Sequence, residues 1–208
     1  MENVTDRISN PFDMRPDCEQ FVPGYGDANA EFHVIGDHPG VHGGADTGVP
    51  FTNEAGLRLQ RALADAGLLH EVGDDPAVSK TFLSYVHMCV SEAPPTDRDY
   101  GDMERFFDAE LRAIAAHVLL PVGARATRHV LQTYSARAGK VSADMDDLHG
   151  TEILGSGFLI LPIKEPAEWV EGDHERLVAG LRELQRTDFR REVDLGRFLA
   201  GDDPYMVR

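Results

Sequence analysis

The feature of this sequence that most constrains its fold is the alternation of short apolar runs with amphipathic segments. The apolar runs have the length and composition of buried strands. They lie at residues 31–36, 82–90, 117–122 and 157–163. The amphipathic segments, which place apolar side chains at helical spacing, begin at Thr52 or Asn53 and at about Met103, and cover residues 123–134 and 175–185. Buried strands joined through helices are typical of a parallel sheet covered on both faces. The pattern therefore predicts an α/β protein, a three-layer α/β/α fold with a central four-stranded parallel sheet.

The length of 208 residues suits one well-packed domain. We expect a single domain over residues 1–208, with residues 1–29, rich in Pro, Gly and Asp, as an irregular arm. Residues 188–208 are expected to form a C-terminal appendage. Its apolar residues, which would dock it as a short helix, are Phe189, Val193, Leu195 and Phe198.

The charge balance is strongly acidic, with 36 Asp and Glu against 20 Lys and Arg and a formal net charge of −16. Such a surface indicates adaptation to molar salt, where a Debye length of about 3 Å screens self-repulsion. A merely acidic protein without salt adaptation is the alternative. Residues 1–16 lack a signal-peptide pattern, and no apolar run approaches the roughly 20 residues that span a bilayer. We therefore expect a cytoplasmic, monomeric protein that does not enter a membrane.

The two cysteines, Cys18 and Cys89, are too few for a disulfide framework. Cys89 lies in an apolar run and is expected to be a small core residue. A cluster of His33, Asp37, His38 and His42 invites a metal-site interpretation. It lacks a helical His pair or a C-x-x-C motif, so no metal site is expected.

The loop after the first predicted strand reads Gly36-Asp-His-Pro-Gly-Val-His-Gly-Gly-Ala-Asp-Thr-Gly-Val-Pro-Phe51. It resembles the first motif of the uracil-DNA glycosylase superfamily, in which Gly-x-x-Pro-Gly is followed by Thr-Gly-x-x-Phe. The His-Gly pair at His42 and the Thr-Gly pair at Thr47 resemble the thermophilic type b enzymes, and residues 47–51 are also similar to the single-strand-selective enzymes. Further resemblances follow in family order. They are residues 85–95 with their double proline, residues 107–126, and residues 161–167 at the place of the second motif. The resemblance covers roughly Gly24 to Leu184.

The resemblance implies a repair enzyme that hydrolyses the N-glycosidic bond of a flipped uracil or other deaminated base in single-stranded or damaged duplex DNA. Ligands of such sheets bind beyond the carboxyl ends of the strands. We therefore expect the glycine-rich turn after the first strand to face the Lys-Glu-Pro turn after the last one, with a nucleobase between them. Phe51 would stack on that base, with a core position beneath the loop as the alternative reading. The other expected base-binding residues are Pro39, Gly40, His42, Asn53 and Met88, and the expected DNA contacts are Lys164, Arg98, Arg125 and Arg128.

The expected catalytic residues are Asp37, His38 and Glu165. Asp37 would orient water or stabilise an oxocarbenium ion, and His38 would act as general base or hydrogen-bond the base. Glu165 occupies the place of the family's second-motif histidine, and an ionised carboxylate there opposes departure of a uracil anion. Protonation of Glu165, a cation from Lys164 or a substrate other than uracil would each relieve this conflict.

Other departures from the family concern cofactors and activity. The iron–sulfur branch binds a cluster through four cysteines, but Glu92 and Met103 fall at or near two of those positions, so no cofactor is expected. Trp169 lies where relatives insert a wedge into the DNA stack, although packing is an equal explanation. A catalytically inactive relative that binds DNA or a nucleobase, or serves as an interaction module, is the main alternative function. An unrelated α/β enzyme acting on a small nucleotide is another.

Overall fold

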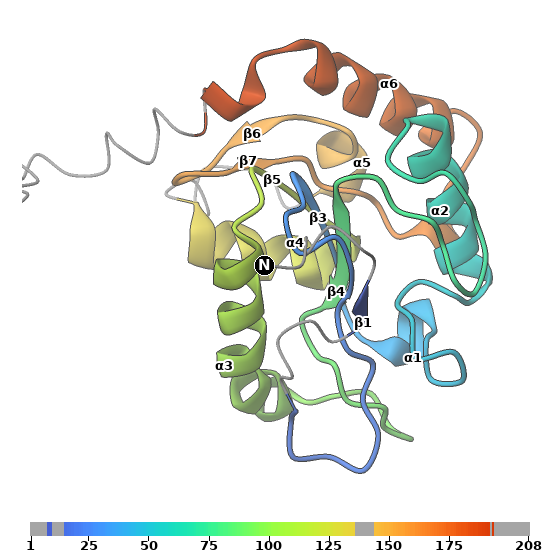
Figure 1. Cartoon of the computed structure of the whole chain (residues 1–208), viewed down its shortest axis with the longest axis vertical. Coiled ribbons are helices and arrows are strands. Elements are labelled where there is room, and N and C mark those ends of the chain that lie inside the picture. Colours follow the sequence, from blue (N-terminus) through green and yellow to red (C-terminus); the bar gives the residue numbers. More distant parts are fainter. Residues whose placement is uncertain (1–7, 10–14, 136–143, 192, 194–208) are drawn as a thin grey trace, which may run out of the picture.

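The computed structural model describes residues 8–9, 15–135, 144–191 and 193, and these residues form a mixed sheet between two layers of helices (Figure 1). The sheet order is β1-β2-β4-β3-β5-β7-β6. The strands are β1 (Ile8–Ser9), β2 (Tyr25–Gly26), β3 (Phe32–Gly36), β4 (Thr81–Tyr85), β5 (Val118–Pro121), β6 (Ile153–Leu154) and β7 (Leu159–Ile160).

The sheet is larger than the sequence predicts and is not purely parallel. The central strand β3 pairs in parallel with β4 and β5, and β7 pairs in parallel with β5. Antiparallel strands extend both edges, since β2 pairs with β4 and β6 pairs with β7. The α/β class is confirmed. The central strands β4-β3-β5-β7 run parallel, but they are part of a larger, mixed sheet. The edge strands contain two residues each, which is too short to give a readable apolar pattern.

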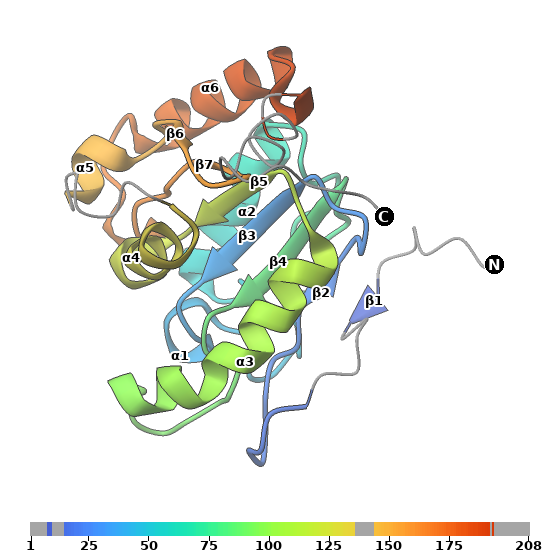
Figure 2. The same ribbon diagram turned by 90° about the vertical axis from the view of Figure 1, so that its left-hand side faces the viewer.

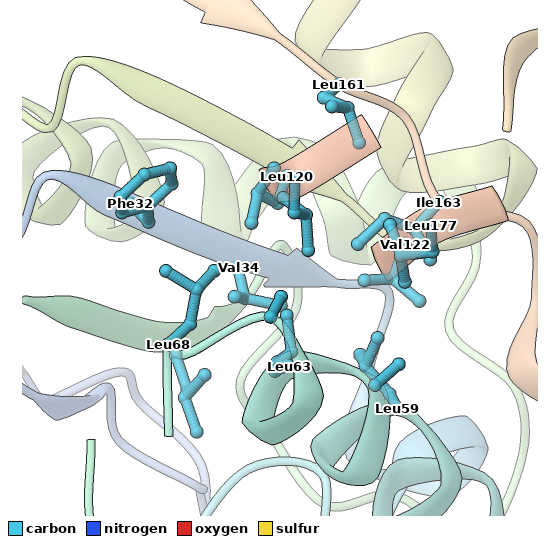
Figure 3. Close-up of a cluster of buried hydrophobic side chains, with 14 of the residues drawn as sticks. Phe32, Val34, Leu59, Leu63, Leu68, Leu120, Val122, Leu161, Ile163 and Leu177 are labelled. Atoms are coloured by element: carbon cyan, nitrogen blue, oxygen red, sulfur yellow. The ribbon is translucent and has the colours of Figure 1, made fainter. Parts of the chain in front are cut away.

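The helices lie on the two faces of the sheet, with α3 and α4 in front of it and α2 behind it in Figure 2. They are α1 (Pro39–His42), α2 (Glu54–Asp65), α3 (Asp97–Ile114), α4 (Gly123–Tyr134), α5 (Met145–Leu148), the 3-10 turn η1 (Pro166–Glu168) and α6 (Asp173–Arg186). Adjacent side chains of β3 point to opposite faces of the sheet, as the two-residue period of a strand requires. Val34 packs with Leu63 of α2 and Leu177 of α6 (Figure 3), whereas Ile35 packs with α3 and α4.

Capping side chains mark the starts of α2 and α3. Asn53 caps α2 as predicted, because its Oδ1 accepts the Gly56 N–H at 2.8 Å. Helix α3 begins at Asp97, six residues before the predicted Met103, since Thr96 and Asp99 form a capping box. This extra turn carries polar side chains toward the carboxyl edge of the sheet.

Of the N-terminal segment, the structure describes residues 8–9 and 15–29. Its described residues include β1 and β2, and Cys18 forms a disulfide with Cys89. Cys89 does lie in an apolar cluster with Met88 and Met103, as expected, but the sequence did not predict its bond to Cys18. At the other end, Phe189 packs on Phe32 with ring centroids 5.4 Å apart, while Leu195 and Phe198 lie outside the described residues.

A search of the described residues for a helix long and apolar enough to cross a membrane found none.

Candidate functional site

The glycine-rich loop leaves β3 at Gly36 and lies at the carboxyl edge of the sheet, next to the end of β4. The backbone N–H groups of Val86 and His87 donate to the carbonyls of Gly36 and Asp37, at 2.9 and 3.0 Å. The loop then forms the short helix α1, whose N-cap is His38. These bonds fix Asp37 and His38 at the position where ligands of parallel sheets bind.

The glycine-rich turn and the Lys-Glu-Pro turn face one another, as predicted, but they touch directly instead of leaving the expected space for a nucleobase. Their contact is a hydrogen bond of 3.0 Å between Nε2 of His42 and Oε2 of Glu165. His42 is fully buried, and the side chain of Glu165 is 18% exposed. Within the described part of the chain, His42 Nδ1 and Glu165 Oε1 are buried without a hydrogen-bond partner. The junction between the turns therefore holds unsatisfied polar atoms, the kind of group that a ligand or water satisfies.

The space beside this contact is filled by an aromatic stack. The His42 ring lies 5.1 Å from the Phe51 ring and 6.1 Å from the Tyr85 ring, at an interplanar angle of 15° to the latter. Phe51 is only 1% exposed. In this conformation, His42 covers a face of Phe51, and the Phe51 ring occupies a core position, the alternative to base stacking.

Phe51 itself is held in an unusual backbone conformation, with φ of +64°. A bulky residue at positive φ costs about 1–3 kcal/mol and needs support from its surroundings. The Phe51 N–H donates to the Tyr85 hydroxyl at 2.7 Å, and Gln60 Nε2 donates to the Phe51 carbonyl at 2.8 Å. A Cβ on Gly56 would lie 2.3 Å from the Phe51 backbone, so glycine is required there. The loop is thus built to keep this ring in place.

His38 is a neutral hydrogen-bond donor. Its Nδ1 accepts the Gly40 N–H at 3.1 Å, which places the proton of a neutral ring on Nε2. Burial lowers the pKa of His38, and the nearby Asp37 carboxylate only partly opposes that effect. Near neutral pH the ring therefore presents an N–H rather than a basic nitrogen.

Asp37 is half-buried, and its Oδ1 accepts a hydrogen bond from the Tyr100 hydroxyl of α3. His87 lies beside Tyr100, with ring centroids 5.5 Å apart. Burial lowers the pKa of His87 as well, so this neighbour is neutral near pH 7. The charge of Asp37 also acts on the Arg125 guanidinium, whose pKa is raised chiefly by its hydrogen bond to Asp97.

The other expected base-binding residues contact the protein itself. The Nδ2 of Asn53 donates to the Val41 carbonyl at 2.7 Å, in addition to capping α2. Met88 is 1% exposed within the cluster around Cys89. Pro39 is buried at the start of α1, while Gly40 is exposed. Gly40 is thus the exposed member of this pair, although its N–H donates to His38 Nδ1.

Most of the expected DNA-contacting cations have acidic partners. Lys164 pairs with Asp146 and, at 3.4 Å, with Asp173. Arg125 pairs with Asp97 at 3.0 Å, and Arg98 lies 3.8 Å from Asp102. Arg128 lies exposed on α4. The ammonium of Lys164 is therefore engaged away from the His42–Glu165 contact.

Trp169 is a packing residue in this conformation. It is 5% exposed, its Nε1 donates to the Lys164 carbonyl at 2.8 Å, and the Arg58 guanidinium lies 5.6 Å from its ring centroid. The described residues include no group of three or more His, Cys, Asp or Glu side chains placed to hold a metal ion.

Comparison with known proteins identifies the class. A family model described as the uracil DNA glycosylase superfamily matches residues 23–182. The chain belongs to this superfamily.

Curated relatives include a type-4 uracil-DNA glycosylase of Saccharolobus solfataricus, 23% identical over 86% of this chain and 82% of the relative. A type-5 uracil-DNA glycosylase of Pyrobaculum aerophilum is 32% identical over 55% of this chain and 54% of its own length. A type-5 enzyme of Thermus thermophilus is 34% identical over 54% and 47%. The chain is thus similar to both types, at low identity, and spans about half the length of the type-5 relatives.

Proposed function

We propose that the protein is a DNA glycosylase that hydrolyses the N-glycosidic bond of uracil or another deaminated base in single-stranded or damaged duplex DNA. The observation that carries this proposal is the adjacency of an acceptor and a donor at the end of β3. Asp37 supplies the carboxylate, and His38 supplies the Nε2–H. The family match and the names of the relatives support the reaction class.

In the proposed reaction, the bond between C1′ of the sugar and the base breaks and its electron pair leaves with the base. Asp37 stabilises the developing positive charge on the sugar and accepts the proton of the attacking water. His38 donates its Nε2–H to the negative charge that develops on the base. In this assignment, His38 takes the role that the second-motif histidine has in the family.

Glu165 has a different role in this proposal. Before the base enters, its Oε2 accepts a hydrogen bond from His42. Its Oε1 remains an acceptor for an N–H group on the base edge. Stacking of the base on Phe51 requires the His42 ring to move, so substrate entry includes displacement of His42.

The second candidate is a catalytically inactive relative that binds DNA or a nucleobase. The burial of Phe51 behind His42 favours it, because the closed stack leaves that ring face covered. The acidic surface and the paired cations do not favour tight DNA binding, since phosphate contacts rely on free Lys and Arg and weaken steeply with salt.

Base release from defined oligonucleotides separates the two candidates. Folded protein in molar KCl is incubated with single-stranded and mismatched DNA that contains uracil or hypoxanthine, and alkali-labile abasic product is measured. The glycosylase proposal predicts product from at least one substrate, with a rate at least tenfold lower for Asp37→Asn. Binding without product across the set favours the inactive relative.

A further inference from the structure

The first turn of α3 places a tyrosine beside Asp37, at the carboxyl edge of the sheet. The sequence pattern did not indicate this tyrosine. The capping box of Thr96 and Asp99 begins the helix at Asp97, so Tyr100 lies in its first turn. The half-buried Tyr100 hydroxyl donates to Oδ1 of Asp37, which follows β3. This bond joins residues that are 63 positions apart in the chain.

The Tyr100 ring is fixed from more than one side. The Arg125 guanidinium of α4 lies over it, 4.4 Å from the ring centroid, and Arg125 is itself paired with Asp97 at 3.0 Å. The edge of His87 contacts the ring from the end of β4 at a centroid distance of 5.5 Å. A cation above an aromatic face is attracted to the ring electrostatically. Residues of α4 and of the segment after β4 therefore fix the direction of the Tyr100 hydroxyl.

From this arrangement we infer that Tyr100 is a positioning residue for the Asp37 carboxylate, and that Arg125 holds the Tyr100 ring rather than a DNA phosphate. The inference rests on the proposed function, since it assigns Asp37 a part in the reaction.

The chemistry of a phenol suits this role. A hydroxyl that donates to Oδ1 fixes the rotation of the carboxylate. Among the hydrogen bonds of the described residues, none involves Oδ2 of Asp37, so that oxygen is left for the attacking water. Burial, together with the Asp37 charge, raises the pKa of Tyr100. The phenol thus keeps its proton and remains a donor throughout the pH range in which a glycosylase is assayed.

The chain contains a matched control for this contact. Tyr134, at the end of α4, donates to Asp108 of α3 at 3.0 Å. It is half-buried like Tyr100, and the same causes raise its pKa. Tyr134→Phe therefore removes an equivalent hydrogen bond at a place that has no part in the proposed reaction.

Single-turnover base release by Tyr100→Phe and Tyr134→Phe, with the best substrate of the wild-type protein, tests the role. We expect Tyr100→Phe to lower the rate at saturating protein about tenfold or more while half-saturation changes less than about threefold. Tyr134→Phe should leave both unchanged. Arg125→Gln should produce a smaller fall of the same kind, because the ring loses its support but keeps its hydroxyl.

A titration without catalysis tests the contact itself. Tyrosine ionisation is followed by ultraviolet absorbance at alkaline pH, in wild type and in Asp37→Asn. Removal of the Asp37 charge should allow one late-ionising tyrosine to ionise at lower pH, and Tyr100→Phe should abolish that change.

The outcomes separate the two claims. An active wild type with equal rates for Tyr100→Phe and Tyr134→Phe overturns the role of Tyr100 and leaves the glycosylase proposal intact. An unchanged titration in Asp37→Asn overturns the contact and with it the role. An inactive wild type with the expected titration overturns the glycosylase proposal, and the positioning role in that reaction falls with it.

Discussion

Removal of the His42 ring should both destabilise the protein and open its base site. The fully buried imidazole makes aromatic contacts with Phe51 and Tyr85 and donates to the Glu165 carboxylate. Each aromatic contact is worth about 0.5–1.5 kcal/mol, and a hydrogen bond to a charged group about 1.5–3 kcal/mol. We expect His42→Ala to lower the free energy of unfolding by about 3 kcal/mol. For a chain of this size, that is a fall in Tm of about 6–12 °C.

The same substitution should strengthen binding of a nucleobase. Stacking of a base on an aromatic ring contributes about 1–3 kcal/mol, which corresponds to about 5- to 150-fold in Kd. Because His42→Ala uncovers the face of Phe51, we expect tighter binding of a uracil-containing single-stranded oligonucleotide, measured by fluorescence anisotropy in molar KCl. Thermal unfolding of the same samples gives the stability change.

His33 provides the control for this experiment. It is also fully buried and hydrogen-bonded, through Nε2 to Ser84 Oγ at 2.7 Å, but it packs against Phe82 and Phe107, on the face that α3 covers. His33→Ala should therefore destabilise the protein without a gain in binding. Unchanged or weaker binding by folded His42→Ala would refute the conclusion that His42 occupies the place of the base.

Three further predictions concern charge. Glu165→His should raise the rate of uracil release, because a hydrogen-bond donor replaces a carboxylate beside the leaving base. Glu165→Gln removes the charge alone and should give a smaller gain. No change in either variant would mean that residue 165 does not contact the base. Burial raises the pKa of Glu110 to about 8, so over part of the range from pH 5 to pH 8 the native state holds a proton that the unfolded state has released. The contribution of Glu110 to stability should therefore fall as the pH rises through that range. Urea unfolding should show that Glu110→Gln gains stability relative to wild type from pH 5 to pH 8, and a constant difference would contradict this. The net charge of −16 predicts that Tm rises steadily from 0.1 to 2 M KCl as repulsion is screened, whereas a flat profile would contradict salt adaptation.

Local sequence patterns were sufficient to place the two turns of the site. The apolar runs that became β3 and β7 and the glycine-rich loop after Gly36 indicated a common carboxyl edge, and the His42–Glu165 contact lies there. The capping role of Asn53 could also be predicted from the sequence, because an Asn before an amphipathic segment is a common helix start.

The packing of the site could not be predicted from local sequence patterns. Burial of His42 depends on Glu165, 123 positions away, and no local pattern encodes that pairing. Tyr100 was missed because the apolar spacing of α3 begins only at Met103. The Thr-x-x-Asp pattern at Thr96 and Asp99 was a signal that could have extended the helix to include it. Likewise, the disulfide partner of Cys89 follows from the path of the N-terminal segment along the end of β4.

The claim on which the account depends most is that Asp37 and His38 act together on a scissile N-glycosidic bond. Mass spectrometry of the free base released from a deaminated single-stranded oligonucleotide tests it most directly, in wild type, Asp37→Asn and His38→Ala. The account predicts free base from the wild type and at least a tenfold lower rate for each variant. Free base at equal rates from all three folded proteins, or none from the wild type, would contradict it.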